Sequence, residues 1–291
     1  MAHTRQHLFV FLGVMFISFS SIFIRMAEAP SLIIAFYRLL FTVLLLLPLF
    51  LREGISELKT LNRNLIVLST MSGVFLALHF YAFMASLKYT SVTSSTVLVT
   101  IHPIFVGLGS FYFLKEKMSS GFVKAVFITL IGGIVISISD AGQGNSALFG
   151  DVLAFLGALL MTLYMLIGRV ARQKISVTTY TFWVYLSSTI TLFVINLIVK
   201  KPFYPYAMKE WILFLAMAFV CTVLGHNVLN WALKFLNPTF ISTAILGEPV
   251  FATFWAMLFF SEFPGMFQLI GSSIVIFGLL MLIKKTEQPK I

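Results

Sequence analysis

Long apolar stretches separated by short polar connections make up almost the whole chain. Ten of these stretches have the length of about 20 residues that an α-helix needs to cross the hydrocarbon core of a bilayer. They lie at 8–27, 31–51, 65–87, 91–114, 121–139, 150–170, 177–199, 211–233, 238–260 and 265–284. The pattern therefore predicts an all-α membrane protein with ten transmembrane helices and no sizeable soluble domain.

The composition excludes an ordinary soluble protein. Hydrophobic residues make up 59% of the 291 residues and charged residues only 10%, whereas charged residues make up about a quarter of a typical soluble domain. The formal net charge is +10, but no basic stretch is dense enough for a nucleic-acid site, so we expect the excess charge to face anionic lipid headgroups. The expected partners are the bilayer and a small-molecule substrate, and not a nucleic acid.

The distribution of lysine and arginine predicts the orientation, because positively charged loops are retained on the cytoplasmic side of a membrane. With both termini inside, 14 of the 20 lysines and arginines flank the inner ends of the spans and five, including Arg25 and Lys88, flank the outer ends. We therefore expect a multi-pass protein of the cell (inner or plasma) membrane with both termini in the cytoplasm. The first span ends in Ala27-Glu28-Ala29, which resembles a signal-peptide cleavage site, but its match to the sixth span indicates a retained anchor.

Seven residues of the first half recur 146 positions later in the second half. They are Lys88, Thr93, Pro103, Phe105, Phe113, Glu116 and Gly132, which recur as Lys234, Thr239, Pro249, Phe251, Phe259, Glu262 and Gly278. Each half holds five spans, an odd number, so the second copy crosses in the opposite direction and the halves form a 5+5 inverted-topology repeat. We predict a first repeat at 1–143 and a second at 144–291. Such a pair provides the two packings, open to either side, that alternating access requires.

The most specific motifs lie in the second span and near the end of each repeat. They are Phe36-Tyr37-Arg38-Leu39-Leu40, then His102-Pro103-Ile104-Phe105 to Leu114-Lys115-Glu116-Lys117, and Gly247-Glu248-Pro249-Val250-Phe251 to Ser261-Glu262. In these motifs the chain resembles the drug/metabolite transporter superfamily, with two EamA-type domains covering nearly all of it, although the Gly-Glu-Arg ending typical of the family is looser here. The resemblance implies an exporter or exchanger of small metabolites, often amino-acid-like or amphipathic compounds.

We expect a secondary transporter that moves a small organic metabolite outward by alternating access, with proton exchange. The alternative is a channel or facilitator for small solutes, which would line a pore with rings of polar residues. An enzyme is not expected, because the chain has no GxxxxGK[ST], HExxH or CxxC motif. For the same reason we expect no cofactor and no metal.

Ionisable residues at membrane depth are costly and therefore mark candidate functional sites. Glu248 is the acidic residue in the middle of the ninth span, where it could carry a coupling proton, pair with a cationic substrate, or serve only to fix the packing around Pro249. His102 occupies the equivalent position in the first repeat. A titratable group thus precedes a proline in both copies, and we expect Pro103 and Pro249 to kink their helices.

Arg38 is the basic residue that lies well inside a span. It could clamp an anion or pair with Glu248, or it could bond backbone carbonyls at a helix break. Further polar or aromatic candidates lie on the second, third and eighth spans. They are Tyr37, His79, His226, Asn230 and Trp231. A single intramembrane histidine more often packs than binds a ligand, but polar groups converging from several spans are typical of a pocket.

Overall fold

The computed structural model describes residues 2–114, 121–141, 145–232, 241, 244–245 and 247–284, and every regular element in these residues is helical. The helices are α1 (Ala2–Met26), α2 (Ser31–Leu49), η1 (Phe50–Gly54), α3 (Ile55–Thr60), α4 (Arg63–Ser86), α5 (Val92–Val99), α6 (His102–Leu114), α7 (Phe122–Ala141), α8 (Asn145–Arg172), α9 (Val177–Val199), α10 (Met208–Ala216), η2 (Met217–His226), α11 (Asn227–Ala232), α13 (Gly247–Phe260) and α14 (Met266–Lys284). The π-helical segments η1 and η2 continue the helices before them.

Seven helical stretches of the described chain are long and apolar enough to cross a membrane. They are His7–Met26, Ser31–Thr60, Arg63–Ser86, Val92–Phe113, Ser146–Arg172, Val177–Val199 and Met208–Ala232. Shorter apolar helices occupy the predicted fifth, ninth and tenth spans, at Lys124–Ile136, Gly247–Phe260 and Met266–Gly278. The expectation of an all-α, multi-pass membrane protein is thus confirmed, while a count of ten complete spans stays a prediction.

Several predicted features lie outside the described residues. These are the repeated positions Glu116, Lys234 and Thr239, and the predicted repeat boundary between residues 143 and 144.

The predicted fourth span is divided into two helices. Ser91 begins α5 by accepting a hydrogen bond from the backbone N–H of Ser94, a standard N-cap. The helix ends at Thr100, where the backbone leaves the helical conformation, and α6 starts two residues later with Pro103 in its first turn. A proline is compatible with a first turn because the amide it removes has no partner there in any helix. The break lies in the interior, where Thr100 is buried.

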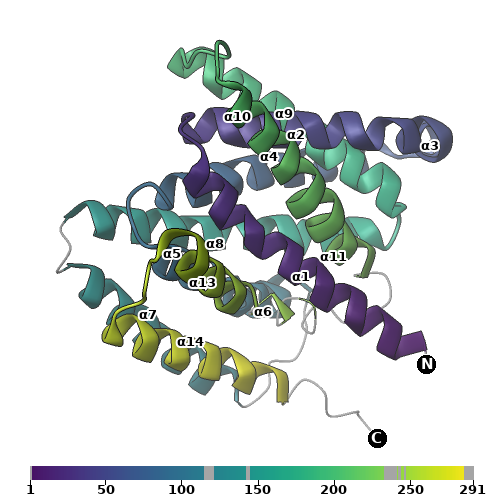
Figure 1. The fold of residues 1–291 in the computed structure, drawn as a ribbon. Helices are drawn as coiled ribbons and strands as arrows, with labels where there is room; N and C mark the ends of the chain where they lie inside the picture. Colours follow the sequence, from purple (N-terminus) through teal and green to yellow (C-terminus); the bar gives the residue numbers. More distant parts are fainter. Residues whose placement is uncertain are drawn as a thin grey trace, which may run out of the picture.

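The helices pack in pairs that correspond between the two predicted halves (Figure 1). The extensive contact of α4 with α8 is matched by that of α1 with η2, and the contact of α4 with α9 by that of α2 with η2. Three further contacts, of α2 with α9, α5 with α13 and α7 with α14, join equivalent helices to one another. The interior is therefore formed where the two sets of helices meet.

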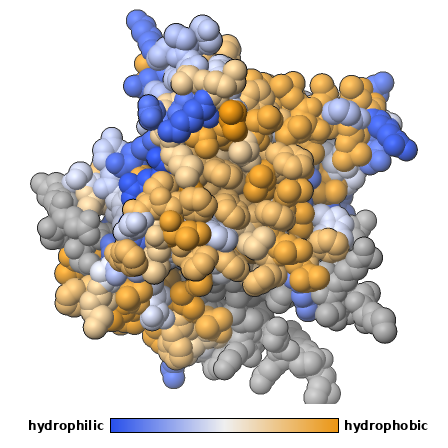
Figure 2. All heavy atoms as spheres, viewed as in Figure 1, coloured by the Kyte–Doolittle hydropathy of each residue, from blue (hydrophilic) through white to orange (hydrophobic). Residues whose placement is uncertain are grey.

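The exterior of the molecule is strongly hydrophobic. Exposed side chains include Phe127, Ile138, Ile198 and Leu258, and Figure 2 shows hydrophobic residues across the middle of one face, with hydrophilic ones toward the ends near α10 and α3. In water such a surface would promote aggregation, whereas hydrocarbon solvates it. Polar side chains are instead found inside, where Arg38 is completely buried.

Candidate functional site

A small cavity, with about 30 Å³ open to water-sized molecules, lies among helices of both predicted halves. We call it the central cavity. Its lining is Ile17, Ser20, Arg38, His79, Phe80, Phe83, Val99, Thr100, His102, Met161, His226, Ile245 and Glu248. The structure therefore brings five of the residues singled out in the sequence to one place, from α2, α4, α6, η2 and α13.

Arg38 is held rigidly on α2 at the wall of the central cavity. Its Nε donates to Thr222 Oγ1 at 2.9 Å and its Nη1 donates to Ser20 Oγ at 2.7 Å. The guanidinium also lies 4.2 Å from the centre of the Phe80 ring, in cation–π geometry. Its remaining nitrogen, Nη2, is buried and has no hydrogen-bond partner in the described part of the chain. A buried donor without a partner is costly and uncommon, so this nitrogen marks a position where a ligand could bind.

Glu248 lies in the first turn of α13 and is 7% exposed. Its carboxyl group faces the same cavity as Arg38, yet the two side chains form no ion pair within the described residues. The N-terminal turn of a helix stabilises negative charge through the helix dipole. The cavity thus presents one positive and one acidic side chain that do not neutralise each other directly.

Two histidines of the cavity use their Nδ1 atoms on backbone carbonyls. His79 Nδ1 lies 2.9 Å from Gly157 O, and His102 Nδ1 lies 3.2 Å from Val99 O. A carbonyl only accepts, so Nδ1 carries the proton in both rings and, in a neutral ring, Nε2 is an acceptor. In the described residues, His102 Nε2 is buried without a partner. His102 can therefore accept a proton or a hydrogen bond from a ligand.

A second cavity, which we call the side cavity, adjoins the central one. It is smaller still, with about 20 Å³ open to water-sized molecules. It is lined by Met161, Tyr164, Met165, Gly168, His226, Leu229, Asn230, Ile241 and Ile245. Met161, His226 and Ile245 line both cavities. Asn230, a candidate from the sequence, thus belongs to the side cavity.

Tyr37 and Trp231 lie elsewhere. The Tyr37 hydroxyl donates to Phe203 O at 2.8 Å, and its ring stacks on Phe214 with centroids 5.1 Å apart. Trp231 meets Phe9 edge to face at 5.9 Å. Neither residue is among those that line the two cavities.

The prolines flank the central cavity without lining it. Pro103 is the second residue of α6 and Pro249 the third of α13, each directly after the titratable residue that lines the cavity. Both therefore lie in the first turn of a helix, next to His102 and Glu248. Neither proline stands inside its described helix, where we expected it to produce a kink.

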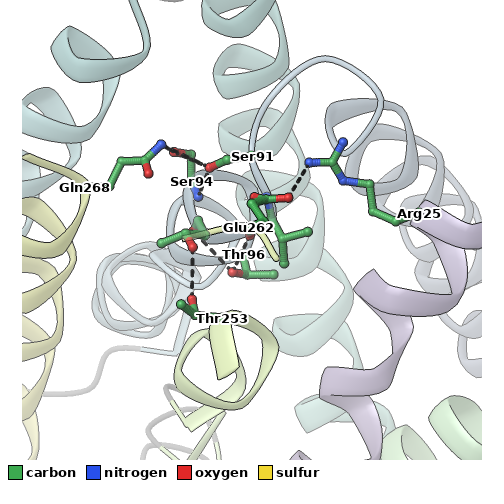
Figure 3. Close-up of polar contacts among 9 residues, drawn as sticks. Arg25, Ser91, Ser94, Thr96, Thr253, Glu262 and Gln268 are labelled. Atoms are coloured by element: carbon green, nitrogen blue, oxygen red, sulfur yellow. Dashed lines mark hydrogen bonds and ion pairs between the residues drawn. The ribbon is translucent and has the colours of Figure 1, made fainter. Parts of the chain in front are cut away.

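A polar cluster joins the ends of four helices, and we call it the end cluster. The carboxylate of Glu262, which follows α13, accepts two hydrogen bonds. One comes from Arg25 Nη2 on α1 at 2.9 Å, and the other from the backbone N–H of Val92 on α5 at 2.8 Å. Gln268 of α14 donates to Ser91 and Ser94, both at 3.2 Å (Figure 3). The end cluster fastens α1, α5, α13 and α14 to one another.

Further contacts tie α1, α5 and α13 together between the end cluster and the central cavity. Thr253 of α13 lies 3.1 Å from Thr93 of α5, hydroxyl to hydroxyl. Trp255 Nε1 donates to Ser18 Oγ on α1 at 3.0 Å, and the Trp255 ring stacks on Phe19 at 4.6 Å. On this side the cavity is covered by packed and hydrogen-bonded side chains.

Sequence reasoning missed the partners that hold Arg38. Ser20 and Thr222 are hydroxyl residues in apolar helices, where such residues commonly bond their own backbone, so nothing in the sequence marked them. The role of Glu262 was also missed, although its recurrence 146 residues after Glu116 was a usable signal. In the described residues, no group of three or more histidine, cysteine, aspartate or glutamate side chains is placed to hold a metal ion.

Comparisons with known proteins agree with this architecture. The model of the EamA-like transporter family matches residues 4–138 and 148–284. An uncharacterized transporter of Archaeoglobus fulgidus is 26% identical, over 98% of this chain and all of that protein. The pseudopaline exporter CntI of Pseudomonas aeruginosa is 24% identical, over 86% of this chain and 85% of its own length.

A solved crystal structure shares the fold. It covers 98% of this chain and 99% of its own, with a TM-score of 0.70 at 15% sequence identity. Because the family model matches nearly the whole chain in two copies, the chain belongs to the EamA-like transporter family.

Proposed function

For this member of the EamA-like transporter family, we propose secondary transport of a small organic metabolite that carries both a carboxylate and an ammonium group. The observation that supports it is the unpartnered Nη2 of Arg38 in a cavity that also contains the unpaired Glu248. Charges that a protein buries are normally paired or hydrogen-bonded. Here the missing partner of each charge would be supplied by the substrate.

The substrate would bind with its two charged ends in opposite directions. Its carboxylate would accept from Arg38 Nη2, a charge-assisted hydrogen bond of the stronger kind. Its ammonium group would donate to Glu248 and to His102 Nε2. Amino-acid-like compounds have this pair of groups on one carbon, so they match the cavity better than a simple anion or cation.

Proton exchange would use Glu248. When the substrate leaves, a carboxylate at membrane depth can take up a proton instead, so substrate and proton would occupy the site alternately. Export is the proposed direction, which agrees with the export function in the name of the Pseudomonas aeruginosa relative. In the cell membrane, both termini would lie in the cytoplasm and the end cluster would face outward.

Alternating access would come from the two predicted halves, packed as a 5+5 inverted repeat of ten spans. The matched helix contacts support this arrangement. With the end cluster closed, the cavity is covered on the proposed outer side. Opening that cover while closing the other side would exchange the two packings of the halves.

The test is uptake into proteoliposomes of the purified protein, with amino acids, nucleosides and cationic drugs as candidate substrates. Each would be measured with and without an imposed pH gradient. We expect saturable uptake of amino-acid-like zwitterions that increases with the gradient and shows counterflow. Flux that does not saturate would contradict a carrier and favour a channel. Saturable uptake that does not depend on the pH gradient would contradict proton exchange.

A further inference from the structure

A third space lies at the surface of the molecule, between α7 and α8, and we call it the surface groove. About 570 Å³ of it is open to water-sized molecules, far more than in either interior cavity. Wall residues such as Ile138 of α7 and Val152 of α8 are more than half exposed. The floor is formed by Leu98 and Ile101, at the end of α5 and in the break after it, and both are buried. The groove is therefore open to the exterior and reaches the interior helices.

Two adjacent glycines of α7 have opposite surroundings. A Cβ atom on Gly132 would lie 2.7 Å from the backbone oxygen of Gly271, so this side of α7 packs closely against α14 (Figure 1). A Cβ atom on Gly133 would meet Leu98 and Ile101 at 3.6 and 3.7 Å, which is ordinary contact distance. The missing side chain thus permits helix contact at Gly132, whereas at Gly133 it leaves the groove deep.

The lining of the groove suits hydrocarbon. Among the described residues that line it, Asp151 alone is polar. Asp151 is 4% exposed, and its Oδ1 accepts a hydrogen bond from the Thr90 hydroxyl at 3.1 Å. A polar ligand would lose its hydration in the groove with little compensation, whereas an acyl chain has no hydrogen bonds to lose. The groove is therefore built for an apolar ligand.

The length of the groove matches one leaflet of a bilayer. Its lining extends from Leu130 to Ile138 on α7 and from Leu148 to Leu156 on α8, eight residue steps in each helix and therefore about 12 Å. Half of a hydrocarbon core of about 30 Å is about 15 Å. Ile138 lies near the end of α7 and Leu148 near the start of α8, so the groove begins near a membrane surface and runs toward the middle of the bilayer.

From these observations we infer that the surface groove is a lipid site that binds one acyl chain of a bilayer phospholipid. The groove is continuous with the apolar exterior of this multi-pass protein, so lipid chains are always beside it. Lipid chains are as apolar as the helix surface, so the bound chain is retained by van der Waals contacts with the two walls and the floor.

The bound chain would also contact the break between α5 and α6. Leu98 and Ile101 face the groove, while their neighbours Val99, Thr100 and His102 line the central cavity. The break is thus the partition between the lipid site and the central cavity. This inference does not depend on which substrate the protein transports.

The experiment uses the full-length protein in proteoliposomes that contain a phosphatidylcholine with a photoreactive diazirine on one acyl chain. After illumination, mass spectrometry of peptides identifies the labelled residues. We expect label on the floor residues Leu98 and Ile101 as well as on the exposed residues Ile198 and Leu258. The floor residues are buried, so a chain reaches them only by entering the groove.

Gly133 provides the main variant, because a side chain there would project from the floor into the groove. Gly133→Leu should lose the label on the floor and keep the label on Ile198. Gly265→Leu adds the same side chain at an exposed position after α13, and should leave all labelling unchanged. Val152→Trp narrows the groove from an exposed wall and repeats the test if Gly133→Leu aggregates.

Three results would overturn the lipid site. The first is label on Ile198 and Leu258 without label on the floor. The second is undiminished floor label in Gly133→Leu that elutes as a monodisperse peak. The third is a dimer in gel filtration that Gly133→Leu separates into monomers, because a second copy of the chain would then occupy the groove.

Discussion

The end cluster and the central cavity each bring an arginine and a glutamate together, but only the end cluster pairs them. Arg25 and Glu262 are 2.9 Å apart, and Glu262 accepts a second bond from the backbone of Val92. Arg38 and Glu248 line one cavity without pairing within the described residues, and Arg38 keeps a buried donor free. The first arrangement pairs its two charges and so holds helices together, although Arg25 Nε, like Arg38 Nη2, is buried without a partner in the described residues. The second is complete only when another molecule supplies the missing partners.

The same residue types should therefore respond differently to the same substitution. In the end cluster the ion pair is partly exposed, with side chains 29% and 24% accessible, so its loss should cost little. In the cavity the charges are desolvated, so small chemical changes should have large effects.

The largest contrast is expected from replacing glutamate by glutamine. Glu248→Gln removes the group that would carry the proton, so uptake driven by a pH gradient should fall to the level of protein-free vesicles, while substrate exchange without a gradient continues. Glu262→Gln is the matched control, and gradient-driven uptake should stay within about twofold of the original because a partly exposed pair contributes little. Unchanged coupling in Glu248→Gln would contradict the proton role.

A second contrast comes from replacing arginine by lysine. Lysine keeps the charge but cannot bond Ser20, Thr222 and a ligand at once, as the planar guanidinium can. Arg38→Lys should weaken binding of zwitterionic substrates about tenfold, which corresponds to the loss of one hydrogen bond to a charged group. Binding would be measured by thermal shift of the detergent-purified protein.

The control for this contrast is Arg25→Lys, which should bind with unchanged affinity because a lysine can still approach Glu262. Gel filtration of both variants tests the alternative that Arg38 acts in folding and not in ligand binding. Aggregated Arg38→Lys alongside monodisperse Arg25→Lys would mean that Arg38 acts in folding, and the anion-clamp interpretation would be wrong.

A third experiment asks whether the end cluster covers the cavity. Val99 lines the central cavity and would be replaced by cysteine in a Cys221→Ser background, then labelled with a membrane-impermeant maleimide from outside the cell. Adding Glu262→Gln should speed labelling a few-fold, the size expected for loss of a partly exposed ion pair. Glu28→Gln removes the exposed pair of Glu28 with Lys209, 3.5 Å apart, and should leave the rate unchanged. Equal rates in the two variants would show that Glu262 is not part of the cover.

The smallest effect is expected at Lys88, which joins the end of α4 to the end of α1. Its Nζ donates to the carbonyl of Ala27 at 2.5 Å. This carbonyl lies at the C-terminal end of α1, where the helix dipole stabilises a positive charge. Partial burial lowers the pKa of Lys88 from its ordinary value of 10.5. Lys88→Met should therefore change the free energy of unfolding by less than about 1 kcal/mol near neutral pH.

The pH dependence of that difference has a definite sign. Because the folded protein releases the Lys88 proton at a lower pH than the unfolded chain, the original protein should gain stability relative to Lys88→Met as pH rises toward 10.5. Melting temperatures of both proteins between pH 7 and 10.5 would measure it. A difference that shrinks over this range would contradict the lowered pKa.

The order of apolar and polar residues is enough to predict a helical, membrane-embedded protein. In hydrocarbon each helix must satisfy its own backbone hydrogen bonds, and each spanning helix therefore appears as a long apolar run. The same logic marked Arg38, Glu248 and His102, since an ionisable residue in such a run is too costly to be incidental. The recurrence at 146 residues gave the two repeats, which the family match supports.

Which of the candidates share a cavity depends on how the helices pack. A hydrophobic pattern on an intramembrane helix does not distinguish the side that faces lipid from the side that faces another helix, because both are apolar. Hence Tyr37 and Trp231 were grouped with residues of the central cavity, whose lining does not include them, and Ser20 and Thr222 were overlooked. Which hydroxyl reaches which guanidinium nitrogen depends on how three helices approach one another, and that is set by packing between segments far apart in the chain.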